Sequence, residues 1–337
     1  MRKIFCFSVI ILFAILVGLP SCNKSLSAGV DDIEICFEAQ CADSPFSLAA
    51  DTKATAATSI TSFRASVTTG TPGSETQASP CWSNVVFTSD GASAPTYVAS
   101  PSKYWPLANP QYHVYAVAAS PAAAAATAAA ASNLTFGAAG TSITLASDVD
   151  KDVVCAYLPY GTTGGTTAVY KAKNALSFEH VFGRLSTVKV KAAGGYAVSN
   201  VSICLVNAKT GGTYNLRTGA GRHDGTGWSA LSPADGSCPV LYTYAGTIAA
   251  GGSNTGSDND LYLVPGTYFL RASWTAGIDN YTESFVDKVS STPVSVVGGK
   301  VNAIEAVLGG NATEIRFAVS LSPWGSNTIG DVEFPVL

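Results

Sequence analysis

Short apolar segments separated by glycine-rich turns recur along most of this chain, and they restrict its fold more than any other feature. In several of them apolar and polar residues alternate, as where Val188, Val190 and Ala192 are interleaved with two lysines. This alternation predicts β-strands with one buried face. Similar segments occupy residues 85–87, 112–117, 143–145, 153–157, 201–205, 261–264, 267–272, 301–308 and 315–321. Many short strands without helical patterns between them favour sandwiches over βαβ units.

Length and charge further restrict the domain organisation and the function of the chain. The 337 residues suggest two domains, and we place the boundary so that the domains span 58–175 and 176–337. Charged residues make up 12% of the chain, and its formal charge is −4. Removing residues 1–21 leaves 17 basic against 23 acidic residues, a formal charge of −6. A chain without a basic footprint is not expected to bind nucleic acid.

The amino terminus has the pattern of an export signal. Arg2 and Lys3 precede an apolar run over residues 4–17, which is too short for a stable transmembrane helix. Leu19, Ser21 and Cys22 then match a bacterial lipobox, although Pro20 is unusual inside one. We therefore expect residues 1–21 to be a lipoprotein signal peptide and Cys22 to be the lipid attachment site. Lipid chains on Cys22 would anchor the mature protein to a membrane. The alternative is an ordinary signal peptide that leaves Cys22 as a thiol.

The segment after Cys22 is interpreted as a tether. Residues 22–57 are mostly small and polar, and they contain one strand-like patch at residues 33–37. This composition predicts a tether that carries a removable or exchangeable strand. The glycine-rich stretch from Lys209 to Asp260 is in contrast predicted to form long loops.

The cysteines predict disulfides and argue against a metal site. Once Cys6 leaves with the signal and Cys22 is acylated, six remain, and six cysteines allow 15 pairings that sequence cannot resolve. Their spacing matches no zinc motif, so we expect no metal and no cofactor. Cys155 and Cys204 lie inside strand-like runs and are predicted to be small buried fillers.

No segment carries an enzyme signature. Arg222, His223 and Asp224 are adjacent in a glycine-rich loop, whereas a catalytic histidine needs a nucleophile and an orienting group placed around it. Asp148, Asp150 and Asp152 have the spacing of a calcium loop, but the glycine and glutamate that such a loop requires are missing. We therefore expect no catalytic residues and no metal ligands.

An ordered set of motifs resembles the fimbrillin family of Bacteroidales outer-membrane lipoproteins, the subunits of type V pili. The most specific piece is residues 176–185, in which Phe178, His180 and Leu185 are similar to the family pattern F-x-H-x-hydrophobic-x-x-L. The other segments that carry the resemblance are the lipobox at Cys22 and residues 51–55, 61–67, 104–106, 112–116, 152–157, 261–265, 298–300, 315–317 and 323–324. Together they cover nearly the whole chain.

The resemblance implies a fold and a mode of assembly. The fold would be two transthyretin-like antiparallel β-sandwich domains in tandem. The chain would be a structural subunit of an outer-membrane surface fimbria that supports adhesion, and its partners would be other fimbrial subunits joined by donor-strand exchange. Val332, Phe334 and Val336 alternate with polar residues or proline, so residues 331–337 are the candidate donor strand. The alternative is that this tail completes its own domain.

Maturation by proteolysis is a further implication of the resemblance. Family subunits are commonly cut by an arginine-specific protease, but between Cys22 and Arg64 the only basic residues are Lys24 and Lys53. Arg64 lies in the first predicted core strand. The candidate cleavage site is therefore Lys53, unless the chain stays uncut as an anchor, a tip subunit or a surface protein outside a pilus.

A second functional hypothesis is a monomeric surface lipoprotein that binds a glycan or a host ligand. Trp228 in the glycine-rich loop, or Trp82, would stack on a sugar. Burial in the core is the more frequent fate of tryptophan in a sandwich.

Overall fold

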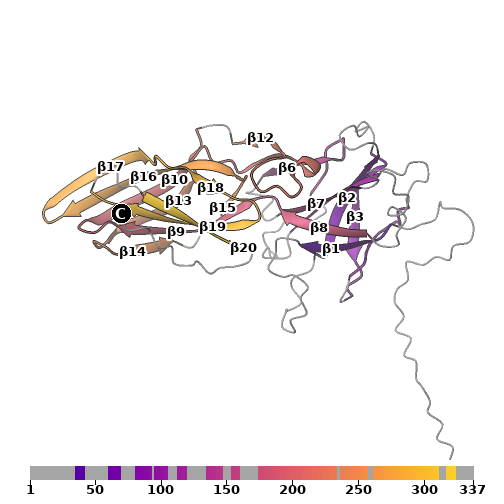
Figure 1. Ribbon diagram of the computed structural model, residues 1–337, viewed down its shortest axis with the longest axis horizontal. Helices are drawn as coiled ribbons and strands as arrows, with labels where there is room; N and C mark the ends of the chain where they lie inside the picture. Colours follow the sequence, from indigo (N-terminus) through magenta and orange to yellow (C-terminus); the bar gives the residue numbers. More distant parts are fainter. Residues whose placement is uncertain are drawn as a thin grey trace, which may run out of the picture.

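The protein is almost entirely β-structure, with one four-residue helix, α1 (Leu216–Gly219). The computed structural model describes residues 35–41, 60–69, 80–92, 95–104, 112–119, 134–146, 153–159, 174–233, 236–256, 261–310 and 316–323. Two lobes lie one after the other along the long axis of the molecule (Figure 1). No helix in these ranges has the length and apolar character needed to cross a membrane.

The first lobe is a closed barrel. Its strands follow the order β1-β4-β3-β2-β5-β7-β8 around the barrel. Their bounds are β1 (Phe37–Cys41), β2 (Ser62–Thr69), β3 (Trp82–Ser89), β4 (Tyr97–Ala99), β5 (Tyr112–Ala119), β7 (Val153–Pro159) and β8 (Asn174–His180). Alternate residues of each strand point inward, as in Phe63, Ala65 and Val67 of β2, which are fully buried. The apolar alternation of the sequence thus becomes the barrel core.

The second lobe contains two sheets. The β10 sheet has the order β13-β10-β16-β17, and β18 also pairs with β16; the β9 sheet has the order β14-β9-β19-β20, and β15 also pairs with β9. Their strands are β9 (Gly183–Ala192), β10 (Ala197–Val206), β13 (Val240–Ile248), β14 (Ser253–Gly256), β15 (Leu261–Leu263), β16 (Gly266–Ile278), β17 (Tyr281–Val289), β18 (Val294–Val296), β19 (Lys300–Leu308) and β20 (Arg316–Pro323).

The two sheets share one apolar core. Trp274 of β16 lies in its centre, stacks on Phe285 with the ring centroids 4.8 Å apart, and donates its indole N–H to the carbonyl of Gly309 at 2.8 Å. Val188 and Val190 of β9 pack into the same cluster from the other sheet. Two sheets with a common core between them form a sandwich.

A third sheet joins the lobes. It is three-stranded, with β11 (Gly211–Asn215) between β12 (Trp228–Ser232) and β6 (Ser142–Ala146). The apolar cluster beneath it combines Tyr115 and Val117 of the barrel with Phe182, Tyr214 and Val264. The junction between the lobes is therefore packed rather than a bare linker.

The prediction of an all-β protein is confirmed, and every strand predicted from alternation overlaps an observed strand. The expectation of purely antiparallel sheets is wrong for two pairs, since β1–β8 and β9–β19 are parallel. Residue 176, the start of the predicted second domain, lies inside β8, whose partners β1 and β7 belong to the barrel.

The interpretation of Lys209–Asp260 as long loops is wrong. This stretch contains β11, α1, β12, β13 and β14. These elements were missed because threonine, serine and glycine occupy many of their positions and leave few large apolar residues to mark a buried face. In β13, only Tyr242 and Ile248 are buried.

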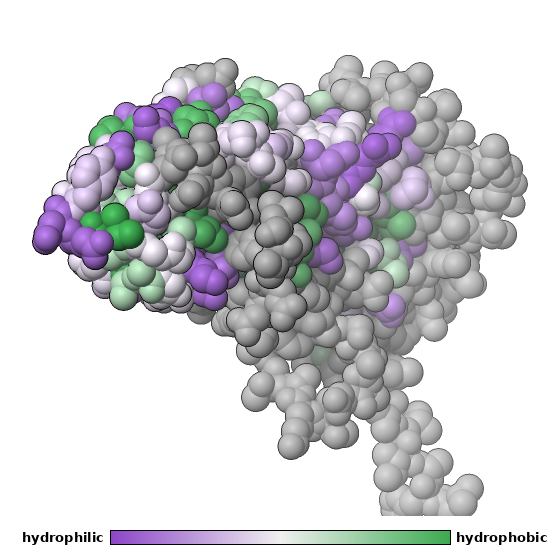
Figure 2. All heavy atoms as spheres, turned by 60° about the vertical axis from the view of Figure 1, so that its left-hand side comes forward, coloured by the Kyte–Doolittle hydropathy of each residue, from purple (hydrophilic) through white to green (hydrophobic). Residues whose placement is uncertain are grey.

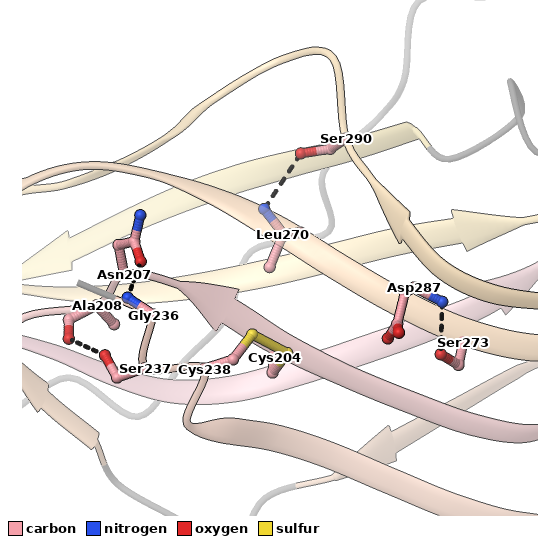
Figure 3. Close-up of a disulfide and its surroundings, with 10 residues drawn as sticks. All are labelled: Cys204, Asn207, Ala208, Gly236, Ser237, Cys238, Leu270, Ser273, Asp287 and Ser290. Atoms are coloured by element: carbon pink, nitrogen blue, oxygen red, sulfur yellow. Dashed lines mark hydrogen bonds between the residues drawn. A yellow bond between two sulfur atoms is a disulfide. The ribbon is translucent and has the colours of Figure 1, made fainter.

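The cysteines gave one correct and one wrong prediction. Cys155 is buried without a disulfide, and burial, followed by the charge of Glu179, raises the pKa of its thiol. Cys204 is instead bonded to Cys238, with the Cα atoms 5.4 Å apart (Figure 3). The alternation of β10 itself points Cys204 away from the core, because Ile203 and Leu205 on either side of it are buried.

Replacing both Cys204 and Cys238 by serine should lower the free energy of unfolding by roughly 3–4 kcal/mol, because their sequence separation is 34 and closing a loop of that size restricts the unfolded chain. Urea denaturation of the two proteins measures the difference. The double substitution is a cleaner test than a reductant, since Cys36 is also disulfide-bonded. An unchanged midpoint would show that the bridge does not contribute.

Candidate functional site: the β1 slot of the barrel

Strand β1 closes the barrel, although it comes from the amino-terminal tether. It lies between β4 and β8, pairing parallel to β8 through five residue pairs and antiparallel to β4 through Phe37 and Tyr97. Neither neighbour is next to β1 in the chain. We call the space between β4 and β8 that β1 occupies the β1 slot.

Apolar side chains hold β1 in this slot. Ile35 and Phe37 are fully buried, Glu38 is exposed, and Ala39 packs against the barrel core. The ring of Phe37 contacts Phe87 and Phe63 edge-on, with centroids 5.0 and 5.8 Å apart. Such contacts add to the stabilisation that comes from burying the ring.

Four aromatic residues form the seat for Phe37. Phe63 is at its centre, 5.4 Å from Phe87, 5.2 Å from Tyr97 and 5.5 Å from Phe178 between ring centroids. These residues come from β2, β3, β4 and β8. Without Phe37, this cluster would face an open groove.

Backbone hydrogen bonds complete the attachment on both sides. The amide of Ile35 donates to the carbonyl of Lys103 at 2.8 Å, and the amide of Asn174 donates to the carbonyl of Cys36 at 3.1 Å. Any extended segment with apolar residues at alternate positions is able to make bonds of this kind. The slot is therefore specific for alternating apolar residues rather than for one particular sequence.

After β1, the next described residue is Ile60. Ile60 is buried, and its carbonyl accepts a hydrogen bond from the hydroxyl of Tyr97 at 2.5 Å. Arg64 follows in β2, paired with Val86 on one side and Val117 on the other. A protease needs an extended, unpaired segment, so the backbone at Arg64 is protected by the sheet.

Most of the predicted site residues lie outside the described residues: Cys22, Lys53, Val332, Phe334 and Val336. Trp228 is described. It is half-buried and packs against Phe182 and Tyr214, each with a centroid distance of 5.1 Å. Its ring thus belongs to the junction between the lobes.

The loop that contains Arg222–Asp224 forms a turn. The carboxylate of Asp224 accepts a hydrogen bond from the amide of Thr226 at 2.9 Å, and hydrogen bonds with Thr226 lower the pKa of Asp224. Within the described ranges, no group of three or more histidine, cysteine or acidic side chains is placed to hold a metal ion.

The sequence indicated a strand near β1 but not the slot that holds it. The patch predicted at residues 33–37 overlaps the observed position, where Ile35–Phe37 are buried and the strand continues to Cys41. The aromatic seat was missed. The only signal for it is the alternation in Phe63–Val67 and Leu176–Phe178, which indicates buried faces but not that they meet.

Residues 49–324 match the family described as fimbrillin-like. The chain belongs to this family. The matched region begins after β1 and includes all the remaining strands of the barrel. A comparison with curated proteins found no significant match.

Two solved structures of low sequence identity share the fold, and a third match is weaker. A Parabacteroides distasonis protein with a proposed role in cell adhesion has a TM-score of 0.52 and 10% identity, covering 88% of this chain and 98% of its own. A fimbrial protein from Bacteroides vulgatus has a TM-score of 0.50 and 13% identity, covering 86% and 99%. The tip fimbrial protein Mfa3 from Porphyromonas gingivalis, solved with a C-terminal truncation, has a TM-score of 0.33 and 12% identity, covering 86% and 100%.

Proposed function

We propose that this fimbrillin-like protein is a structural subunit of a cell-surface fimbria, assembled by donor-strand exchange through the β1 slot and supporting adhesion. The observation that carries the proposal is the position of β1, a barrel strand that comes from the amino-terminal tether and is held by the fully buried side chains of Ile35 and Phe37. Removing it would leave the pairs among β2, β3, β4, β5, β7 and β8 intact and would open a groove lined by aromatic rings.

A cut between Cys41 and Ile60 would break the main-chain connection between β1 and the rest of the barrel. Lys53 lies in this interval and is the proposed cleavage site. The hydrogen bond from Tyr97 to the carbonyl of Ile60 would keep the new amino terminus attached to the barrel. The protection of Arg64 by β2 supports a cut upstream of that residue.

The carboxyl-terminal segment of another subunit would fill the emptied slot. In residues 331–337, Val332, Phe334 and Val336 repeat the spacing of Ile35 and of Phe37 and Ala39 in β1. Phe334 would then take the seat of Phe37, between Phe63 and Phe87. Pro335 would take the exposed position of Glu38. It would cost one hydrogen bond of the ladder, because proline has no backbone N–H, but it would not displace any apolar side chain from the core.

The proposal includes export and anchoring. Residues 1–21 would be the lipoprotein signal peptide, residues 22–57 the tether, and Cys22 the lipid attachment site at the outer membrane. The partners are other fimbrial subunits and, at the filament surface, a host or bacterial ligand. Membership of a fimbrillin-like family favours this structural role over an enzymatic one.

The amino-terminal sequence and mass of protein sheared from its native cells test the proposal. We expect a start at Ala54 together with a ladder of multimers that collapses on heating. An acylated Cys22 and a single band would contradict polymerisation and leave an anchor or a monomeric lipoprotein. The glycan hypothesis has less support, because Trp228 is half-buried among the rings of the junction and Trp82 packs against Phe87.

A further inference from the structure

The outer face of the β10 sheet carries an apolar patch in the middle of a polar surface. Its members point away from the sandwich core, and four of them are between 41% and 64% exposed: Phe269, Val240, Val286 and Val289. Figure 2 shows hydrophobic side chains exposed among polar ones over the lobe that holds β16 and β17. Clusters of this kind on a soluble domain mark interaction surfaces.

Strand register makes the patch continuous. Val240, Cys204, Arg271 and Val289 form one row across the four strands, and Phe269 pairs with Val206 in the next row. The Cys204–Cys238 disulfide lies in the same region (Figure 3). The aromatic ring of Phe269 and the guanidinium of Arg271 are of the residue types that are enriched at interface centres.

A β-bulge adds an acidic residue to this face. Val286 and Asp287 both lie opposite Ser273, whose hydroxyl accepts a hydrogen bond from the amide of Asp287 at 3.0 Å (Figure 3). Ser273 points outward because its neighbours Ala272 and Trp274 are in the core. Asp287 therefore lies two positions along from Arg271, roughly 7 Å in the strand direction.

Arg271 and Asp287 are the two charged groups of this face, and the described part of the chain offers neither of them a partner. Among the described residues, neither the guanidinium of Arg271 nor the carboxylate of Asp287 has an ion pair or a hydrogen bond, and they do not pair with each other. A face that holds one unpaired positive and one unpaired negative group is complementary to a copy of itself. A two-fold axis between them would place each arginine over the other copy's aspartate.

We propose that the outer face of the β10 sheet docks a second copy of this chain, with Arg271 of each copy bound to Asp287 of the other. Phe269, Val286 and Val289 form the centre of the contact, and two sheets pack face to face about 10 Å apart. Serine and threonine hydroxyls form the polar rim: Ser199, Ser202, Thr243, Thr275 and Ser284.

This contact is separate from strand exchange. The face lies on the lobe opposite to the β1 slot (Figure 1), so it joins subunits side by side rather than end to end. If the proposed fimbria forms, the contact repeats at every subunit, and even a weak one would bundle filaments through avidity.

Analytical ultracentrifugation of the chain from residue 23 to 337 tests the proposal, because β1 remains in its slot and strand exchange is blocked. We expect a dimer at high protein concentration. Arg271→Glu and Asp287→Lys should each weaken it at least about tenfold, since each places two like charges opposite each other. Combining the two reversals should restore most of the affinity.

Two further variants keep the test interpretable. Asp287 has a φ of 48°, so Asp287→Asn, which tolerates that backbone conformation, should also weaken the dimer if the lysine variant unfolds. Lys191→Glu, on the exposed part of β9, should leave association unchanged. A monomer at all concentrations would overturn the proposal. Two other results would also overturn it: a dimer whose affinity is unchanged by either single charge reversal, or a stably folded double variant whose affinity is not restored.

Discussion

A chain that begins at Ala54 should be less stable than the chain from residue 23 by roughly 3–6 kcal/mol, because it lacks the buried side chains of Ile35 and Phe37, each of which contributes about 1.5–3 kcal/mol. A peptide with the sequence of residues 331–337 should recover part of this loss. Binding to the folded state alone raises the apparent free energy of unfolding as the peptide concentration rises.

Urea denaturation of the two chains, with and without peptide, measures both effects. A peptide of residues 33–41 is the positive control, since it restores the original strand. The 331–337 peptide with Phe334→Asp is the matched negative control. If the shortened chain is as stable as the longer one, or if the peptides leave its midpoint unchanged, the slot is not an acceptor groove.

Local pattern was sufficient to find most strands but not their partners. The alternation of Val201, Ile203 and Leu205 predicts the buried face of β10 from neighbouring residues alone, and the structure places all three in the core. Strand pairing is a property of distant segments. Nothing near Phe37 in the sequence indicates that it meets Phe87 of β3, because that contact depends on the closure of the barrel.

The strands that the sequence concealed are those with few buried side chains. In β17 only Phe285 is buried, and the remaining positions are exposed except for the half-buried Lys288. An edge strand of this kind shows no apolar alternation, yet it carries Val286 and Asp287 of the proposed docking face. Surface strands are thus hard to recognise from the sequence and are still relevant to function.

Replacing Phe334 by aspartate should abolish the heat-sensitive multimers. The seat that Phe334 would occupy is made of Phe63, Phe87, Tyr97 and Phe178, and none of these rings compensates a carboxylate. Placing an unpaired charge in such a site costs several kcal/mol. Gels of sheared surface protein, run with and without heating, should show only monomer for this variant.

Substitutions next to Phe334 distinguish a loss of strand exchange from a general effect of altering residues 331–337. Glu333→Gln should preserve or strengthen the multimers, because Glu333 would occupy the position of Cys36, whose side chain is fully buried, and a neutral amide costs less to bury than a carboxylate. Pro335→Ala should preserve or strengthen them, since alanine restores a backbone donor. If Phe334→Asp instead destabilises the monomer and leaves the ladder unchanged, residues 331–337 complete their own domain and the donor strand must come from elsewhere. The stability of the monomer and the ladder of multimers therefore have to be measured on the same variant. Only the two results together distinguish a strand that is inserted into a neighbouring subunit from one that completes its own domain.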